Sequence, residues 1–209
     1  MNERTAIILA GGKGVRIGRT VKAFLRLSDK TLIERVVESV QPLVDQMVVV
    51  IGRDSPEETF RKMLPERTEI YIDEGEREGA LVGLLTGLRK AKFEYSLVLP
   101  CDSPFVNREV VKLLFSEATG MDAAIPLWPN GFIEPLHAVY KTKPSQKNAE
   151  KALKEGNRIR DMINLLRKVR YIPIEKIREI DRELLSFYNI NTRRDLEKAA
   201  EVYSKLSVV

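Results

Sequence analysis

Cysteine and histidine are almost absent from this sequence, which holds one of each, Cys101 and His137. A single cysteine excludes a disulfide framework and a cysteine-built zinc site, and a single histidine excludes a metal site built from a histidine cluster. No apolar run approaches the ~20 residues needed to cross a bilayer, and no basic leader with a small-residue cleavage site precedes the first strand-like run at residues 5–10. We therefore expect a cytoplasmic protein that does not enter a membrane.

Low-complexity and collagen-like segments are also missing. The chain has 209 residues, of which 44% are hydrophobic and 31% are charged. That composition excludes a disordered chain, and the length suits one α/β domain better than two full ones. We see no internal repeat and no linker, so we expect residues 1–209 to form a single domain.

The net charge of +5 is unevenly distributed along the chain. Residues 1–146 carry 20 basic and 20 acidic side chains, whereas residues 147–209 carry 15 and 10. The basic last third is either a solvated helical surface or a surface that meets an anionic ligand or an acidic partner protein. No basic motif interleaved with aromatic residues accompanies it, so we expect no nucleic-acid partner.

Strand-like and helix-like segments alternate over most of the chain. Apolar runs typical of buried strands occupy residues 5–10, 47–51, 69–73, 95–99, 123–127 and 169–174, and residues 137–141 resemble an antiparallel strand. Helical patterns start after the capping residues Thr31, Ser55, Asn107 and Thr192, and further helices are expected at 80–91 and at 143–166, where a break falls near 156–157. This alternation predicts a three-layer α/β/α sandwich with a mainly parallel, Rossmann-like sheet.

A glycine-rich stretch, LAGGKGVRIG at residues 9–18, follows the first predicted strand. Glycines let a backbone approach a phosphate closely, and Lys13, Arg16 and Lys22 add charge that can neutralise a triphosphate. The sequence contains no Walker loop, and the dinucleotide fingerprint fails at Ile17. The alternative to a nucleotide loop is a tight strand-to-helix turn.

A second candidate element, PCDSP at residues 100–104, follows the apolar run at 95–99. Asp102 is expected at the carboxyl edge of the sheet, where one carboxylate together with substrate phosphates suits Mg²⁺. The alternative is that Asp102 only caps a turn. We interpret the neighbouring Cys101 as a small buried hydrophobic residue, because no base accompanies it.

These residues resemble the MobA-like nucleotidyltransferases, and within them most closely the molybdenum cofactor guanylyltransferases. The similarity runs through LAGGKGVRIG, KAFL at 22–25, GALVGL at 79–84, PCDSP and FYNINT at 187–192. The resemblance implies a sheet of the nucleotide-diphospho-sugar transferase type. It also implies a reaction in which the terminal phosphate of molybdopterin attacks the α-phosphorus of GTP and pyrophosphate leaves.

The resemblance also implies roles for individual residues. Lys22, Asp102 and Arg16 are expected to be catalytic, and Asp102 is expected to hold Mg²⁺. Asn189 and Asn191 match asparagines on the pterin side of the site. The expected nucleotide and cofactor contacts are made by Leu9, Ala10, Gly11, Gly12, Lys13, Gly14, Lys22, Asp73, Asp102, Asn189 and Asn191.

The chain departs from the family pattern at Val21, Ala80 and Arg193, where the family usually has Asp, Pro and Pro. These departures leave other substrates open: CTP with the molybdenum cofactor, GTP with cobinamide phosphate, or a sugar phosphate. A non-catalytic nucleotide-binding regulator is a further alternative. The possible partners are GTP and molybdopterin as substrates and, through transient docking, molybdenum-cofactor enzymes or other cofactor-biosynthesis proteins.

Five other residues, in three places, carry two interpretations each. His137 is expected to be an ordinary strand residue rather than a catalyst, because no base or metal cluster is apparent near it. Trp128 and Phe132 flank a Pro-Asn-Gly turn and form either a wall against a pterin or a packed turn. Arg158 and Arg160 open a helix and either bind the pterin phosphate or face solvent.

Overall fold

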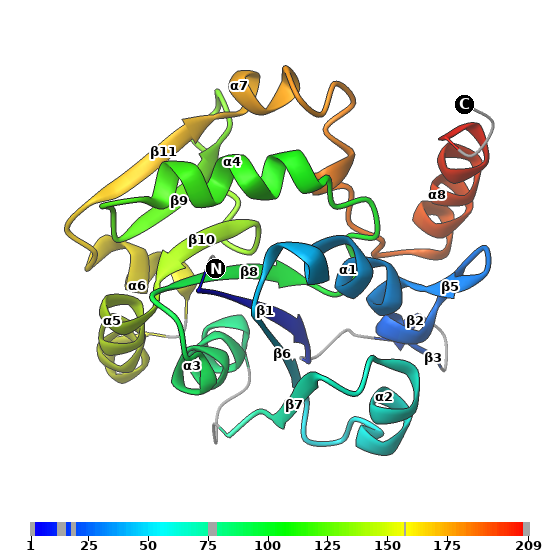
Figure 1. The fold of residues 1–209 in the computed structure, drawn as a ribbon, viewed down its shortest axis with the longest axis horizontal. Coiled ribbons are helices and arrows are strands. Elements are labelled where there is room, and N and C mark those ends of the chain that lie inside the picture. Colours follow the sequence, from blue (N-terminus) through cyan, green and yellow to red (C-terminus); the bar gives the residue numbers. More distant parts are fainter. Residues whose placement is uncertain (1–2, 12–15, 18–19, 75–78, 157, 207–209) are drawn as a thin grey trace.

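The computed structural model describes residues 3–11, 16–17, 20–74, 79–156 and 158–206, with the backbone alone described at 16, 17 and 20. Its centre is a seven-stranded sheet with the order β11-β9-β10-β8-β1-β6-β7 (Figure 1). The strands are β1 (Arg4–Ala10), β6 (Gln46–Ile51), β7 (Thr68–Ile72), β8 (Tyr95–Pro100), β9 (Ala123–Leu127), β10 (Ala138–Lys141) and β11 (Val169–Pro173).

All strand pairs of this sheet are parallel except the two made by β10. Strand β1 pairs in parallel with β6 and β8, and β10 pairs antiparallel with β8 on one side and β9 on the other. In the register between β10 and β8, Ala138 lies opposite Val98. The mainly parallel sheet and an antiparallel strand at 137–141 were predicted. The place of that strand between β8 and β9 was not predicted, and β10 begins at Ala138 rather than at His137.

Helices cover both faces of the sheet and produce the expected three layers (Figure 1). One face carries α1 (Leu32–Val40), α2 (Glu57–Met63), α4 (Arg108–Ala118) and α7 (Ile174–Arg178); the other carries α3 (Ala80–Lys90), α5 (Thr142–Glu155) and α6 (Ile159–Asn164). A large apolar core lies between the sheet and the helices on each face. Strands β1, β6 and β8 are buried on both faces, as the inner strands of parallel sheets are. A third, smaller cluster joins the last helix, α8 (Arg193–Leu206), to Leu27, Leu32 and Ile190.

Three of the four predicted helix caps are present. Thr31 and Glu34 form a capping box, Asn107 accepts from the amide of Glu109 at 2.8 Å, and Thr192 accepts from the amide of Asp195 at 3.2 Å. The predicted cap at Ser55 is wrong, because α2 begins at Glu57 after Pro56. The amide of Ser55 donates instead to the carbonyl oxygen of Gly52, so this residue belongs to the preceding turn.

Several short elements were not predicted. Strand β2 (Arg16–Ile17) pairs with β3 (Thr20–Val21), and β4 (Arg26–Leu27) pairs with β5 (Lys30–Thr31). The single turns η1 (Lys22–Phe24), η2 (Gln41–Leu43) and η3 (Leu185–Phe187) complete the described chain. Among the described residues, no helix has the length and apolar character needed to span a membrane.

Candidate active site

Three segments singled out in the sequence meet at the carboxyl edge of the parallel strands. The amide of Cys101, just after β8, donates to the carbonyl oxygen of Leu9 in β1 at 3.0 Å. The amide of Asp73, just after β7, donates to the carbonyl oxygen of Ile51 at 2.9 Å. The ends of β1, β6, β7 and β8 therefore form one ledge, which is where open α/β sheets bind their ligands.

Lys22 connects this ledge to the end of the chain. Its ammonium nitrogen lies 3.4 Å from Oδ2 of Asp102 and donates a 2.7 Å hydrogen bond to Oδ1 of Asn191. The residue is 9% exposed, so its charge is held against these two oxygens with little contact with water. A cation, a carboxylate and an amide oxygen converge here.

The backbone around Lys22 fixes the direction of its side chain. Lys22 opens the η1 turn, in which the amide of Leu25 donates to its carbonyl oxygen at 3.0 Å. The next two residues are anchored in the core: Ala23 is 1% exposed, and the ring of Phe24 packs 4.6 Å from that of Phe60. The anchored neighbours hold the backbone of Lys22 in place, and its side chain extends toward Asp102.

The carboxyl group of Asp102 is partly buried at the ledge beside the charge of Lys22. Burial raises the pKa of its carboxyl group, and the nearby Lys22 opposes that shift without cancelling it. The carboxylate therefore carries a negative charge that Lys22 only partly compensates, which favours a second cation beside it.

The segment around Asn189 is attached to the loop that carries Asp102. Ser103 donates a short hydrogen bond to Oδ1 of Asn189, and the amide of Ile190 donates to the carbonyl oxygen of Asp102 at 2.9 Å. Residues more than 80 positions apart thus form a continuous surface, and both predicted asparagines lie on it.

Asp73 occupies the other end of the ledge, over the start of α3. Thr86 donates to Oδ1 of Asp73 at 3.2 Å. A side chain added at Gly83 would meet both Cδ2 of Leu9, at 3.6 Å, and Oδ2 of Asp73, at 3.7 Å. Leu9 and Asp73 therefore flank the same glycine of α3.

Gly11 marks the close approach that the sequence pattern predicted. A Cβ atom at this position would lie 2.7 Å from the backbone nitrogen of Gly52, so no larger residue fits without displacing β1 from β6. The preceding Ala10 is buried and Leu9 is half-buried. The candidates Gly12, Lys13 and Gly14 lie outside the described residues, and so does the side chain of Arg16.

The described residues contain no group of three or more His, Cys, Asp or Glu side chains arranged to hold a metal. Asp102 with its partial compensation by Lys22 still suits a hard cation that takes one carboxylate and completes its shell with substrate oxygens. The residues present therefore fit Mg²⁺ brought together with a nucleotide.

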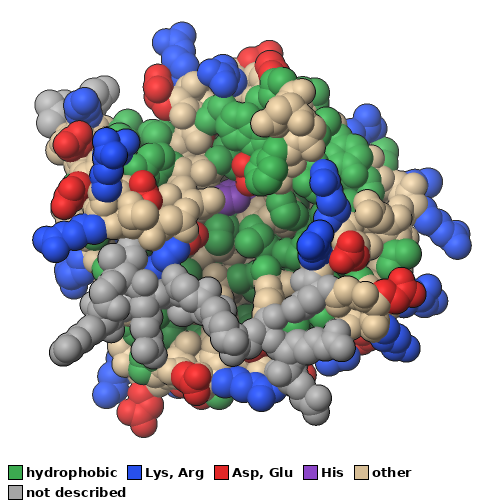
Figure 2. All heavy atoms as spheres, turned by 180° about the vertical axis from the view of Figure 1, so that it is seen from behind, with side chains coloured by type: hydrophobic (Ala, Val, Ile, Leu, Met, Phe, Trp, Pro, Cys, Tyr) green, Lys and Arg blue, Asp and Glu red, His purple; other side chains and the backbone are tan. Residues whose placement is uncertain are grey.

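Sequence reasoning did not place His137 at this edge. The space-filling view in Figure 2 shows the chain's one histidine at the floor of a hollow, with hydrophobic side chains on one side of it and other side chains or backbone on the other. The imidazole packs 5.2 Å from the ring of Phe187, which also contacts the ring of Trp128 at 6.1 Å. The indole nitrogen of Trp128 donates to Glu134 at 2.7 Å. The available sequence signal was a lone histidine directly before an apolar strand.

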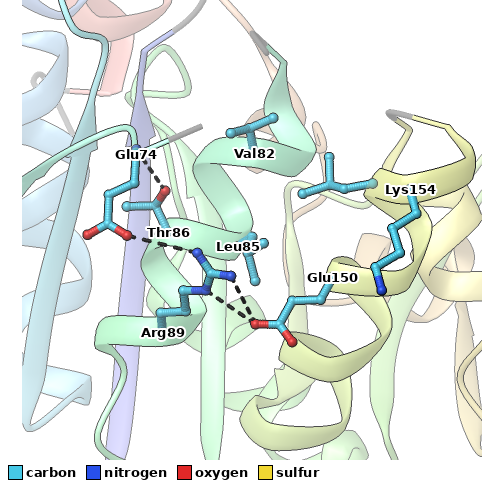
Figure 3. Close-up of a pocket in the computed structure, with 8 residues that line it drawn as sticks. Glu74, Val82, Leu85, Thr86, Arg89, Glu150 and Lys154 are labelled. Atoms are coloured by element: carbon cyan, nitrogen blue, oxygen red, sulfur yellow. Dashed lines mark hydrogen bonds and ion pairs between the residues drawn. The ribbon is translucent and has the colours of Figure 1, made fainter. Parts of the chain in front are cut away.

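A separate pocket of about 480 Å³ lies between α3 and α5 (Figure 3). Arg89 crosses it from Glu74, at 3.9 Å, to Glu150, at 3.0 Å. Acidic partners on both sides therefore already neutralise the charge of this arginine. Its connection to the ledge is indirect, through the Thr86 hydroxyl that contacts Asp73 and the amide of Glu74.

The sequence of this chain is similar to those of known nucleotidyltransferases. Residues 6–170 match the model of the MobA-like NTP transferase domain. A protein of Methanosarcina mazei named as a probable molybdenum cofactor guanylyltransferase is 40% identical over 93% of this chain and 88% of its own length. A Desulfosudis oleivorans protein named as a molybdenum cofactor guanylyltransferase is 34% identical over 95% of both chains.

A solved structure shows the same architecture. The crystal structure of the molybdopterin-guanine dinucleotide biosynthesis protein A from Archaeoglobus fulgidus superposes with a TM-score of 0.77. The two chains are 34% identical, and the match covers 96% of this chain and 99% of the other.

Proposed function

The chain belongs to the MobA-like NTP transferase family, and on that premise we propose that it transfers GMP from GTP to the terminal phosphate of molybdopterin. It is a nucleotidyltransferase. The product is the molybdopterin guanine dinucleotide cofactor. The observation that carries the assignment to this site is the convergence of Lys22, Asp102 and Asn191 at the ledge.

The reaction exchanges one phosphorus–oxygen bond for another. An oxygen of the acceptor's terminal phosphate attacks the α-phosphorus of GTP, the bond from that phosphorus to the bridging oxygen breaks, and pyrophosphate leaves with the electron pair. Such a transfer requires positioning and charge neutralisation rather than a covalent nucleophile. The chain's part is to hold two polyanions close together.

The nucleotide half of the site extends from the end of β1 to Asp73. The ammonium group of Lys22 neutralises phosphate charge, and we expect Arg16 and the backbone amides of residues 11–14 to do the same. Leu9, Ala10 and Asp73 are proposed contacts for the nucleoside, since Leu9 and Asp73 border one surface beside Gly83.

Asp102 is the proposed Mg²⁺ ligand. A bound ion would supply positive charge for the phosphate oxygens as the leaving group develops negative charge. Asp102 would hold the ion, and the ammonium group of Lys22, 3.4 Å from Asp102, would hold phosphate. The negative charge of Asp102 would thus balance both Lys22 and the proposed Mg²⁺.

The acceptor half comprises the segment with Asn189 and Asn191. The hydrogen bond between Asn191 and Lys22 supports a role for this asparagine in holding the lysine, in addition to its proposed place on the pterin side. The hydrogen bond between Ser103 and Asn189 fixes the same segment beside Asp102.

Pyrophosphate release tests the proposal. The purified chain is incubated with Mg²⁺ and molybdopterin and with GTP, CTP, ATP or UTP in parallel. We expect release with GTP that depends on both Mg²⁺ and the acceptor. A preference for CTP would assign another nucleotide, and nucleotide binding without any release would assign a regulator.

The matched variants are Asp102→Asn and Asp45→Asn. Asp102→Asn keeps the size of the side chain but removes the charge, so we expect a loss of at least about 100-fold in rate. Asp45 is exposed just before β6, at the opposite edge of the sheet, and serves as the control. Undiminished release by Asp102→Asn would reject the metal assignment.

The cellular setting forms part of the same proposal. We propose that residues 1–209 act as one domain in the cytoplasm, and that the product passes on by transient docking to molybdenum-cofactor enzymes or other cofactor-biosynthesis proteins. The basic charge of residues 147–209 suits an acidic docking surface. An association of that kind weakens as salt concentration rises.

A further inference from the structure

The direction of β10 brings His137 to the candidate site. Because β10 runs antiparallel to β8, its first residues lie beside the last residues of β8, and Ala138 pairs with Val98. His137 precedes Ala138 and therefore stands at the same edge as Asp102, which follows β8. The parallel strands reach this edge with their last residues, whereas β10 reaches it with its first. His137 therefore lies beside the residues that follow the parallel strands.

The imidazole of His137 carries an unused hydrogen-bonding atom. The residue is 3% exposed, and its Nε2 atom is buried without a partner among the described residues. Burial lowers the pKa of His137 to about 4, whereas a hydrogen bond with the backbone of Ser186 works against that shift. The ring is therefore neutral, and since the bond to Ser186 falls to the other nitrogen, Nε2 is an acceptor.

An orphaned acceptor at this place is unusual. Buried polar atoms are nearly always bonded, and an exception calls for an explanation. A phenylalanine ring would fill the same space among aromatic neighbours without that cost. A buried acceptor without a partner is expected in a binding site whose ligand supplies the hydrogen-bond donor.

The surroundings of His137 suit a flat ring. Phe187 packs between the imidazole and Trp128, with its own ring tilted by 60° and 70° to them. Phe187 is half-buried and lies two residues before Asn189. The turn that carries it starts from Leu184, whose φ of 53° is a left-handed conformation that leucine seldom adopts.

The strained turn is held firmly at its base. The amides of Leu185 and Ser186 donate to the buried carboxylate of Asp181 at 3.0 and 2.8 Å, and the hydroxyl of Ser186 accepts from the amide of Asn107. These bonds keep the backbone in place while the side chain of Phe187, at the end of the turn, remains partly open to solvent.

We propose that this hollow holds the fused ring of the acceptor substrate, and that Nε2 of His137 accepts a hydrogen bond from a ring N–H or amino group. A pterin ring is flat, stacks on aromatic side chains, and carries both kinds of donor. The ring enters by turning the side chain of Phe187 aside. This inference rests on the proposed function, because it locates the acceptor of that same reaction and assigns His137 to its recognition.

The chain's single tryptophan provides the readout. Trp128 borders the hollow, so its fluorescence reports on this site and not on an average over several tryptophans. The probe is 6-hydroxymethylpterin, which has the ring but no phosphate. With correction for absorption by the probe, we expect saturable quenching in the wild-type chain.

Two variants of His137 distinguish the hydrogen bond accepted by Nε2 from the packing of the ring. We expect His137→Phe to bind the probe at least about tenfold more weakly, and His137→Gln, which keeps an acceptor, to recover part of the loss. The control is Tyr140→Phe, which removes the buried hydroxyl bonded to the carbonyl oxygen of Pro135 from the opposite face of β10. That control should bind the probe as the wild type does, and GTP affinity should be unchanged in all three variants.

The outcomes distinguish this inference from the proposed function. Equal probe binding by wild type and His137→Phe, or no saturable quenching in the wild type, would overturn the inference. An unchanged KM for molybdopterin in His137→Phe would also overturn it, and pyrophosphate release by the wild type would still support the proposed function. Conversely, pterin binding that depends on His137 without pyrophosphate release from any nucleotide supports the ring site and rejects the transfer reaction.

Discussion

The ammonium nitrogen of Lys22 and Oδ1 of Asn191 lie 2.7 Å apart, although 169 positions separate the two residues in the chain. The lysine follows the glycine-rich segment, and the asparagine lies in the loop before α8. This hydrogen bond links the proposed nucleotide and acceptor parts of the site, so we expect a change at Asn191 to affect the position of Lys22.

We expect Asn191→Ala to weaken GTP binding by about fivefold, which corresponds to roughly 1 kcal/mol for the loss of one hydrogen bond. The physical reason is that Lys22 loses one of the two oxygens that orient it. Calorimetry with GTP and no acceptor measures the effect. Asn189→Ala is the control, since Asn189 bonds to Ser103 and not to Lys22; equal losses in both variants would contradict the link.

Two glycines of α3 should respond in opposite ways to alanine. A Cβ at Gly87 would overlap Cγ2 of Ile7, whereas the nearest atom to a Cβ at Gly83 is 3.6 Å away. We expect Gly87→Ala to destabilise the fold by about 1–3 kcal/mol, because steric strain against β1 exceeds the gain in helix propensity. Gly83→Ala should stabilise it by about 0.5–1 kcal/mol. Denaturant unfolding checks both, and stabilisation by Gly87→Ala would show that β1 yields easily.

The buried histidine makes stability depend on pH. The folded-state pKa of His137 is about 4, below the ordinary value of 6.5, so between these two pH values the unfolded chain binds a proton that the folded chain does not. Stability that is fully present above pH 6.5 is lost as the pH falls toward 4, by about 3 kcal/mol. His137→Phe should lack this loss. Denaturant unfolding of the wild type and of His137→Phe between pH 4 and 6.5 measures the difference. An equal pH dependence of the two stabilities would mean that the imidazole is exposed to water.

Cys101 should be unreactive in the folded protein. The residue is 4% exposed, and burial, followed by the negative charge of Asp102, raises the pKa of its thiol. Because the thiolate is the reactive form, a disulfide reagent should label the native chain at least about 100-fold more slowly than the unfolded chain. Fast labelling of the native chain would mean that the loop from Cys101 to Asp102 opens readily.

Much of the sheet could be predicted because its strands have unambiguous sequences. The runs at β1 and β6 are continuously apolar, as strands buried on both faces are, and glycine or charged turns delimit them. The two-residue strands β2 to β5 were missed because so short a strand has no periodicity to detect. The cap at Ser55 failed because a turn to Gly52 competes for the same residue.

The site was harder to predict, since its geometry depends on contacts between distant segments. The sequence identified Lys22, Asp102 and Asn191 separately, but nothing in their spacing indicated that the lysine would bond to the asparagine. His137 was interpreted as an ordinary strand residue because a missing hydrogen-bond partner is visible only in three dimensions. Strand order, which carries β10 between β8 and β9, likewise reflects long-range pairing.

The reversed strand β10 separates two parts of the sheet edge that carries the candidate site. The parallel strands β1, β6 and β8 are inner strands of the sheet, and their residues contribute to the apolar cores on both of its faces. The connection from β9 to β10, residues 128–137, contacts the segment before α8 instead, because the rings of Trp128 and His137 pack on Phe187. Under the proposed function, exchanging this connection for that of a relative should change the choice of acceptor while the choice of nucleotide is kept.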